Sequence, residues 1–107
     1  MDTINVINLI IREASRLLPK GAKVILFGSR ARGTAQENSD WDILILLNKE
    51  KRTVEDLDDY GFPFRQLGWD INQEINPIVS TFRDMASGKH SNPLYYNIAN
   101  EGITIWG

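Results

Sequence analysis

The sequence predicts an α/β (α+β) domain, a mixed β-sheet with helices packed on it. Two apolar runs, residues 23–27 and 41–47, have the length and continuity of buried strands. Ahead of them, residues 4–18 place apolar side chains at helical spacing, and helix and strand signals alternate through the rest of the chain. We therefore expect the order helix, strand, strand, helix, strand, helix and short strand, within a single domain over residues 1–107.

The elements predicted in the first half of the chain have clear start and end signals. Asp2 or Thr3 can cap the opening helix, and Pro19 and Gly21 end it. Its apolar residues, which recur at spacings of three and four, are Ile4, Ile7, Ile10, Ile11, Ala14, Leu17 and Leu18. A Gly-Ser turn follows the first strand, residues 30–35 can start a short helix, and a polar turn leads into the second strand.

The second half is less regular. Thr53 with Asp56 resembles a capping box that opens a helix, and residues 61–63 (Gly-Phe-Pro) are expected to interrupt it. A third strand is predicted over residues 71–80, where Pro77 indicates a sheet edge or a bulge. The remaining predicted elements are a capped turn at Thr81 and Asp84, a helix from Pro93 to about Asn100 and a strand over residues 103–106.

The composition limits the classes of ligand and partner that we expect. The net charge is −2, so the chain has no basic excess of the kind that binds a nucleic-acid backbone. Without cysteine, a metal ion would be held by oxygen ligands or by the single histidine, which favours hard cations such as Mg²⁺. No apolar run approaches the roughly 18 residues of a membrane span, and the first residues lack a signal-peptide pattern. We expect no membrane partner and a cytoplasmic location.

The strongest functional signal lies in residues 28–42. Gly28 and Ser29 follow a predicted buried strand, where exposed amides and a hydroxyl can bind phosphate. Asp40 and Asp42 share one side of the next strand, because strands repeat every two residues, and two neighbouring anions there call for a cation. The pair is expected to hold two Mg²⁺ ions that polarise a nucleoside triphosphate. The phosphate contacts are assigned to Gly28, Ser29, Arg30 and Arg32, although the two arginines diverge on a helical turn and at most one is expected to face the ligand.

The pattern Gly-Ser, ten intervening residues, Asp-x-Asp resembles the signature of the DNA polymerase β-like nucleotidyltransferase superfamily. The Arg-Ala-Arg-Gly extension at 30–33 is also typical, and the short chain resembles the minimal nucleotidyltransferases (MNT) of that superfamily. The resemblance implies a polymerase β-like nucleotidyltransferase fold. It further implies ATP and Mg²⁺ as substrate and cofactor, and transfer of a nucleoside monophosphate to a hydroxyl with release of pyrophosphate.

The resemblance also implies a third carboxylate on a neighbouring strand. If residues 70–78 form a regular strand, residues 70, 72, 74 and 76 share a face. Glu74 is the preferred candidate for the third metal ligand and catalytic carboxylate, and Asp70 is the second. Asn76 is expected to be a poor metal ligand.

Many minimal nucleotidyltransferases resemble antitoxins paired with a HEPN-domain ribonuclease, and the resemblance therefore implies a tyrosine of such a toxin as one acceptor. A second hypothesis is a catalytically silent binding module that scaffolds or inhibits a helical partner. A third, a detached subunit of a drug- or polynucleotide-modifying transferase, would call for a basic acceptor groove that the sequence does not display. The acceptor, the base preference, the oligomeric state and the partner's identity stay open at the level of sequence.

Overall fold

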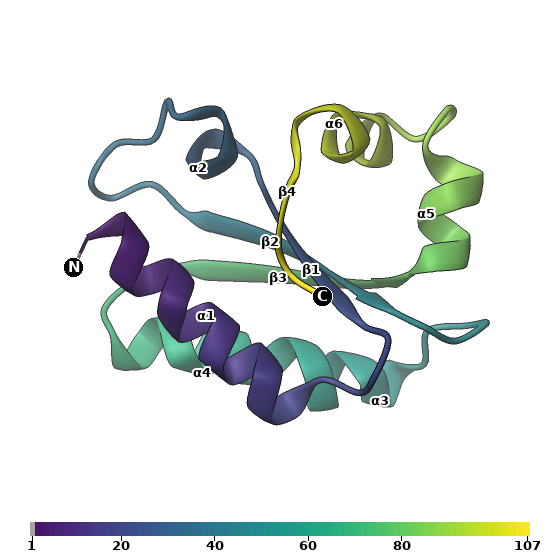
Figure 1. The fold of residues 1–107 in the computed structure, drawn as a ribbon, viewed down its shortest axis with the longest axis horizontal. Helices are drawn as coiled ribbons and strands as arrows, with labels where there is room; N and C mark the ends of the chain where they lie inside the picture. The colour runs from purple at the N-terminus through teal and green to yellow at the C-terminus, as the bar shows by residue number, and fades with distance from the viewer. Residues whose placement is uncertain (1) are drawn as a thin grey trace.

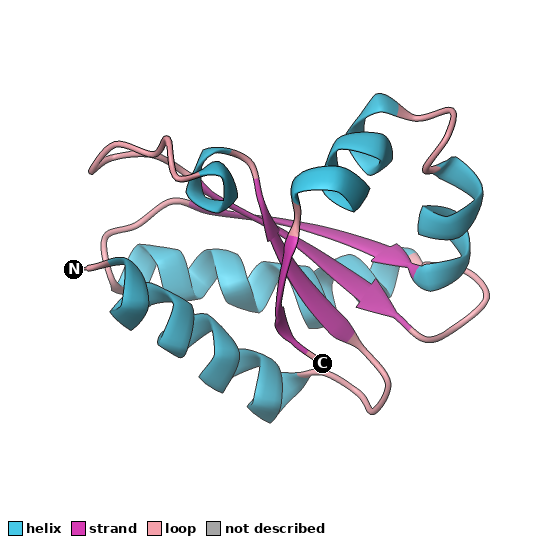
Figure 2. Cartoon of the chain, turned by 45° about the horizontal axis from the view of Figure 1, so that its top comes forward, coloured by secondary structure: helices cyan, strands magenta, loops and turns pink. Residues whose placement is uncertain are grey.

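A computed structural model describes residues 2–107 and contains one four-stranded mixed sheet. The strand order is β3-β2-β1-β4; β1 runs antiparallel to both β2 and β4, and β3 runs parallel to β2. Figures 1 and 2 show helices on both faces of this sheet. The predicted mixed α+β architecture is confirmed. The strands are β1 (Lys23–Phe27), β2 (Trp41–Leu47), β3 (Ile75–Thr81) and β4 (Ile103–Trp106).

Helix α1 (Thr3–Leu17) covers one face of the sheet. Asp2 caps it, because its Oδ1 accepts a hydrogen bond from the backbone N–H of Asn5 at 2.9 Å. Its buried positions are Val6, Ile10 and Ala14. The predicted stripe was therefore wrong at its first position: Ile4 is 71% exposed, and Val6 contributes to the core instead.

A longer helical segment covers the same face beside α1. It consists of α3 (Val54–Asp56), the π-helical turn η1 (Leu57–Gly61) and α4 (Phe62–Asp70). The expected interruption at residues 61–63 does not occur, since the chain stays helical through the π turn η1, and Pro63 follows that turn as the second residue of α4. Pro63 is accommodated rather than breaking the helix.

The opposite face carries α2 (Ser29–Arg32), α5 (Phe82–Gly88) and α6 (Pro93–Glu101). Side chains of β2 alternate between the two layers. Ile43 and Ile45 belong to the cluster beneath α1 and α4, while Leu44 and Leu46 pack with Ile98 of α6. Within residues 2–107, no helix combines the length and the apolar character needed to cross a membrane.

Strand β3 starts later than predicted. Residues 71–74 are not strand, because the N–H of Ile71 still bonds to the carbonyls of Leu67 and Gly68 at the end of α4, and Asn72 then turns the chain with a φ of 56°. The predicted position of Pro77 at a sheet edge is confirmed. This shift of the strand start decides which side chain lies beside the two aspartates.

The predicted capping box at Thr53 and Asp56 is confirmed, and it supplies a test of stability. The Asp56 carboxylate accepts hydrogen bonds from the Thr53 N–H at 2.8 Å and from Lys49 Nζ at 2.9 Å. Burial alone would raise the pKa of Asp56, but these bonds outweigh it, so the pKa lies below the ordinary value of 3.8. The stabilisation is therefore complete above the unfolded-state pKa and is lost as the pH falls through the folded-state pKa.

Asp56→Ala is expected to lower the free energy of unfolding by about 2 kcal/mol at neutral pH. Urea titrations at neutral and acidic pH measure this, and the difference from the unmodified chain should shrink in acid. Glu55→Ala, an exposed carboxylate in the same turn, is the matched control and should change stability little. A loss that does not depend on pH would contradict the assigned cause.

Candidate active site

The two aspartates of the motif lie where β2 begins. Asp40 immediately precedes the strand and Asp42 is its second residue, so both side chains project toward the face that carries α2 and α6. The residue between them, Trp41, points the other way and is 1% exposed in the core. Strand alternation thus places two carboxylates side by side at one end of the sheet.

The Gly-Ser turn, which follows β1, lies beside the two carboxylates. Phe27, the last residue of β1, is the register partner of Asp42. The next residue, Gly28, has a φ of +74°, and a Cβ built on it would lie 2.5 Å from Asp42 Oδ2. Only a glycine therefore fits between the turn and the carboxylate without displacement.

Asn76 of β3 completes the cluster. It is the register partner of Asp42, and its Nδ2 lies 3.1 Å from Asp40 Oδ2 and 3.5 Å from Asp42 Oδ1. A single amide group thus donates toward both carboxylates. Strand alternation in the sequence already places Asn76 on one face with residues 70, 72 and 74, but nothing local shows that Asn76, rather than a carboxylate, reaches the aspartates.

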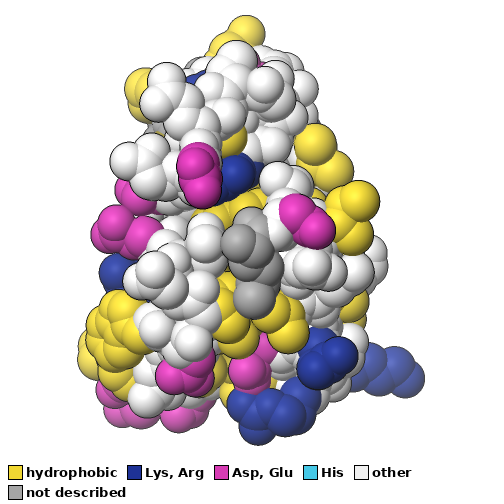
Figure 3. Space-filling model, turned by 90° about the vertical axis from the view of Figure 1, so that its left-hand side faces the viewer, with side chains coloured by type: hydrophobic (Ala, Val, Ile, Leu, Met, Phe, Trp, Pro, Cys, Tyr) yellow, Lys and Arg dark blue, Asp and Glu magenta, His cyan; other side chains and the backbone are white. Residues whose placement is uncertain are grey.

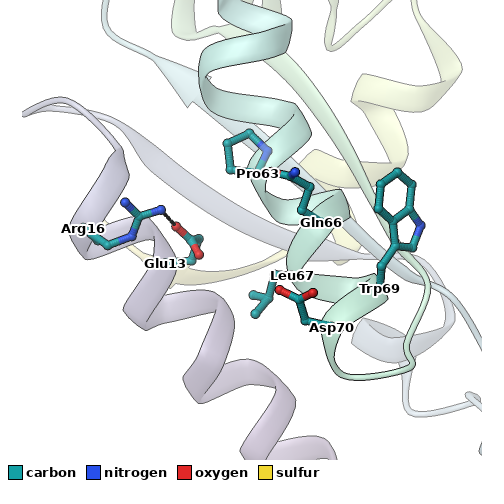
Figure 4. Close-up of a pocket in the computed structure, with 7 residues that line it drawn as sticks. All are labelled: Glu13, Arg16, Pro63, Gln66, Leu67, Trp69 and Asp70. Atoms are coloured by element: carbon teal, nitrogen blue, oxygen red, sulfur yellow. Dashed lines mark hydrogen bonds and ion pairs between the residues drawn. The ribbon is translucent and has the colours of Figure 1, made fainter.

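Neither predicted third carboxylate joins the pair. The carbonyl of Glu74 accepts the Trp41 N–H at 2.8 Å, and the Glu74 side chain is exposed ahead of β3. Asp70 ends α4 and lines a pocket that also includes Glu13 and Arg16 of α1 (Figure 4). Within residues 2–107, no three acidic or histidine side chains are grouped so that they could share a metal ion.

The physical reason is the chain path between α4 and β3. Residues 70–74 form a helix end and a turn, so the two-residue alternation that grouped Asp70 and Glu74 with Asn76 does not apply to them. The strand begins at Ile75, and its register brings the Asn76 side chain to the aspartates.

The surroundings of Asp42 disfavour its ionisation. Its pKa is raised chiefly by burial; the Asn76 hydrogen bond opposes this, the Asp40 carboxylate adds to it, and Arg32 offsets part of it. A bound divalent cation would reverse the balance, since it favours both ionised carboxylates. The partly buried carboxylate pair supplies the oxygen ligands that Mg²⁺ prefers, and the Gly28 turn beside it is too tight for a Cβ. Phosphate oxygens and water would supply the remaining ligands of the ion.

The two arginines of the motif point in different directions. The Nη2 of Arg30 donates to the carbonyl of Ser39 at 2.9 Å, and its guanidinium lies 4.2 Å from the centre of the Trp41 ring. Arg30 therefore braces the loop that leads into Asp40, which the sequence did not indicate. Arg32 is half-exposed, lies 3.4 Å from Glu101 of α6, and acts electrostatically on Asp42.

A family model described as a nucleotidyltransferase domain matches residues 7–86. No curated protein matches the chain. Solved structures share the fold, among them the three that follow. A toxin–antitoxin structure with AMP-PNP is 24% identical with a TM-score of 0.67, over 94% of this chain and 73% of that one.

The second structure is a mutant of the toxin–antitoxin pair MntA–HpeT with two aspartates changed to glutamates. It is 20% identical with a TM-score of 0.65, over 94% of this chain and 72% of that one. The third is described as a putative nucleotidyltransferase from Sulfolobus solfataricus and is 22% identical with a TM-score of 0.55, over 96% of this chain and 81% of that one. At these identities the likeness establishes the fold.

Proposed function

Since this chain belongs to the nucleotidyltransferase domain family, we propose that it transfers a nucleoside monophosphate, AMP from ATP, to a hydroxyl group with the help of Mg²⁺. The observation that carries the proposal is the convergence of Asp40 and Asp42 beside the Gly28 turn. Two neighbouring carboxylates at a turn that admits no Cβ suit a cation-bound triphosphate.

Each residue has a defined part. Asp40 and Asp42 bind the cation and fix the triphosphate relative to the sheet, and the Gly28 backbone approaches the phosphates closely. Ser29 donates its hydroxyl to a phosphate oxygen, and Arg32 supplies positive charge from the exposed end of α2. A Mg²⁺ ion held by Asp40 and Asp42 would polarise the phosphate and activate the attacking hydroxyl.

The partner is the second element of the proposal. Two of the structural neighbours are toxin–antitoxin structures, and one of these contains AMP-PNP. In the other, two aspartates are replaced by glutamates, and this chain too has a closely spaced aspartate pair. These observations support ATP as the nucleotide and an antitoxin role. The acceptor that we propose, a tyrosine of a HEPN-type toxin, follows from the family resemblance of residues 28–42 alone.

The test is incubation of the chain with Mg²⁺, ATP labelled at its α-phosphate and a HEPN-domain protein. Label is expected on that protein, and only when Mg²⁺ is present. ATP labelled at the γ-phosphate should leave no label, because the pyrophosphate departs. Absence of transfer from every nucleoside triphosphate would contradict the proposal.

One observation favours a second candidate, a nucleotide-binding module that scaffolds its partner without transfer. Asn76 takes the position beside the aspartates where the resemblance implies a carboxylate, so the cluster carries one negative charge fewer. Under this alternative the chain binds ATP and its partner but leaves no label on the partner.

Asn76→Asp is expected to increase affinity for Mn²⁺, a spectroscopic substitute for Mg²⁺, about tenfold, because it adds a third anionic ligand. The same change should lower the melting temperature in the absence of metal through added repulsion. Metal titration and thermal melting measure the two effects. Asn97→Asp, on an exposed position of α6, is the control, and unchanged metal affinity in Asn76→Asp would contradict the placement of Asn76 at the cation.

A further inference from the structure

Three adjoining hollows form one groove along the outer side of β3, and their cavity volumes are about 270, 450 and 670 Å³. The first lies between β3 and the helical segment η1–α4 and shares Arg65 with the second. The second shares residues 72–74 with the third, which reaches the loop 36–39. We call this continuous surface the β3 groove.

The β3 groove ends beside the proposed active site. Ser39 lines its last hollow and is joined directly to Asp40. On the other wall, Gln73 and Glu74 hold the start of β2, since Gln73 Oε1 accepts from Trp41 Nε1 at 3.0 Å and the Glu74 carbonyl accepts from the Trp41 N–H at 2.8 Å. The last hollow therefore ends one residue along the chain from Asp40, whose carboxylate, like that of Asp42, projects toward the face that carries α2 and α6.

The charge of the groove is mainly negative. Among its described lining residues, three carboxylates, on Glu37, Asp58 and Glu74, accompany one guanidinium, on Arg65. Figure 3 shows this end of the molecule with acidic and apolar surface interleaved and most of the basic surface set apart at the lower right. Such a groove repels a phosphate backbone and attracts positively charged groups.

An aromatic pair adds a second recognition element. Trp69 is 63% exposed and Phe62 is 43% exposed, and their rings meet edge to face with centroids 5.7 Å apart. Figure 4 shows the Trp69 ring standing out from α4. An exposed indole near carboxylates is suited to a lysine or arginine side chain, which it binds through cation–π attraction.

Strand pairing at this edge is blocked. Pro77 has no backbone N–H, and Arg52 Nη1 donates to the Val79 carbonyl at 3.0 Å. A second copy of the chain, or a peptide added as a fifth strand, would lack those backbone partners. Recognition in the β3 groove must therefore come from side chains.

From these observations we propose that the β3 groove binds an extended, basic polypeptide segment of the acceptor protein. Lysine or arginine side chains of that segment lie against Trp69 and the carboxylates of Glu37 and Glu74. At about 3.3 Å per residue, the stretch from Val79 to Ile75 corresponds to roughly 13 Å of extended chain. The inference rests on the proposed function for its chemistry, but the binding step can be measured without transfer.

The test is fluorescence anisotropy with three labelled probes. The first is a peptide with a central tyrosine flanked by lysines, the second has glutamates in place of the lysines, and the third is a single-stranded RNA of similar length. The lysine peptide is expected to bind at least tenfold more tightly than either of the others. Equal binding of the two peptides, or tighter binding of RNA, would overturn the proposal.

Variants locate the binding surface. Trp69→Ala and Glu74→Lys should each weaken binding of the lysine peptide at least fivefold, while Tyr96→Ala, another exposed aromatic but on α6, should not. Binding that is unchanged in both groove variants would overturn the proposal. Calorimetry of ATP with Mg²⁺ on the same variants should show the same affinity for ATP as the unmodified chain. If the unmodified chain binds the lysine peptide but does not bind ATP, the result counts against the proposed function and not against the groove.

Discussion

Asp42→Asn is expected to reduce nucleotidyl transfer about a thousandfold, which corresponds to roughly 4 kcal/mol of transition-state stabilisation. The amide keeps the size of the side chain but cannot share the charge of a divalent cation with Asp40. The same substitution should leave the free energy of unfolding unchanged or raise it, because burial and the Asp40 carboxylate hold the pKa of Asp42 above its ordinary value of 3.8.

The direction of the change in the free energy of unfolding follows from proton linkage. A carboxyl whose pKa is raised on folding binds protons more readily in the folded state, so its ionisation lowers stability as the pH rises through the folded-state pKa. The penalty is present in full above that pKa and absent below the unfolded-state pKa. Asp42→Asn removes it, and the gain should appear at neutral pH without metal and vanish in acid.

Label transfer and thermal melting of the same preparation measure both effects. Asp59→Asn makes the same chemical change at an exposed position of η1 and should alter neither. Retained transfer would remove Asp42 from the active site. A large loss of stability would mean that Asp42 holds the fold together.

Gly28→Ala is expected to have the second large effect. The added methyl group would lie 2.5 Å from Asp42 Oδ2, and the Gly28 backbone, with φ +74° and ψ −157°, lies in a region that is essentially restricted to glycine. Either the turn or the carboxylate has to move. We expect transfer to fall at least about a hundredfold, since small displacements of a positioned ligand carry costs of that order.

Gly33→Ala is a closely matched control. Gly33 also has a positive φ, +76°, but a Cβ there meets nothing within 4 Å. Its ψ of 15° puts it in the left-handed α region, so Gly33→Ala should carry a smaller backbone strain of about 1–2 kcal/mol in a melting experiment while leaving transfer nearly intact. If the two variants lose transfer equally, the contact between the turn and Asp42 does not matter for catalysis.

The sequence predicts the fold well where one physical signal dominates. The apolar runs of β1 and β2, the Thr53 capping box and the edge position of Pro77 follow from burial, side-chain hydrogen bonding and a missing N–H, and all are confirmed. Membership of the nucleotidyltransferase family, indicated by residues 28–42, is also confirmed.

The fold and site features that the sequence does not predict have a common cause. They depend on packing between segments that are distant in the sequence. Nothing local shows that a π turn carries the chain through Gly61 or that α4 runs to Asp70 with Ile71 as its C-cap. The role of Arg30 depends on the path of the loop it braces. Alternation groups Asn76 with residues 70, 72 and 74, and only the strand start at Ile75 shows which of these side chains reaches the aspartates.

The central claim is that Asp40 and Asp42 together bind a cation-bound triphosphate. Calorimetric titration with ATP, in the presence and absence of Mg²⁺, tests it most directly when the unmodified chain is compared with Asp40→Asn and Asp42→Asn. We predict binding that requires Mg²⁺ and is lost in both variants. Binding that is independent of Mg²⁺, or equal in all three proteins, would contradict the claim.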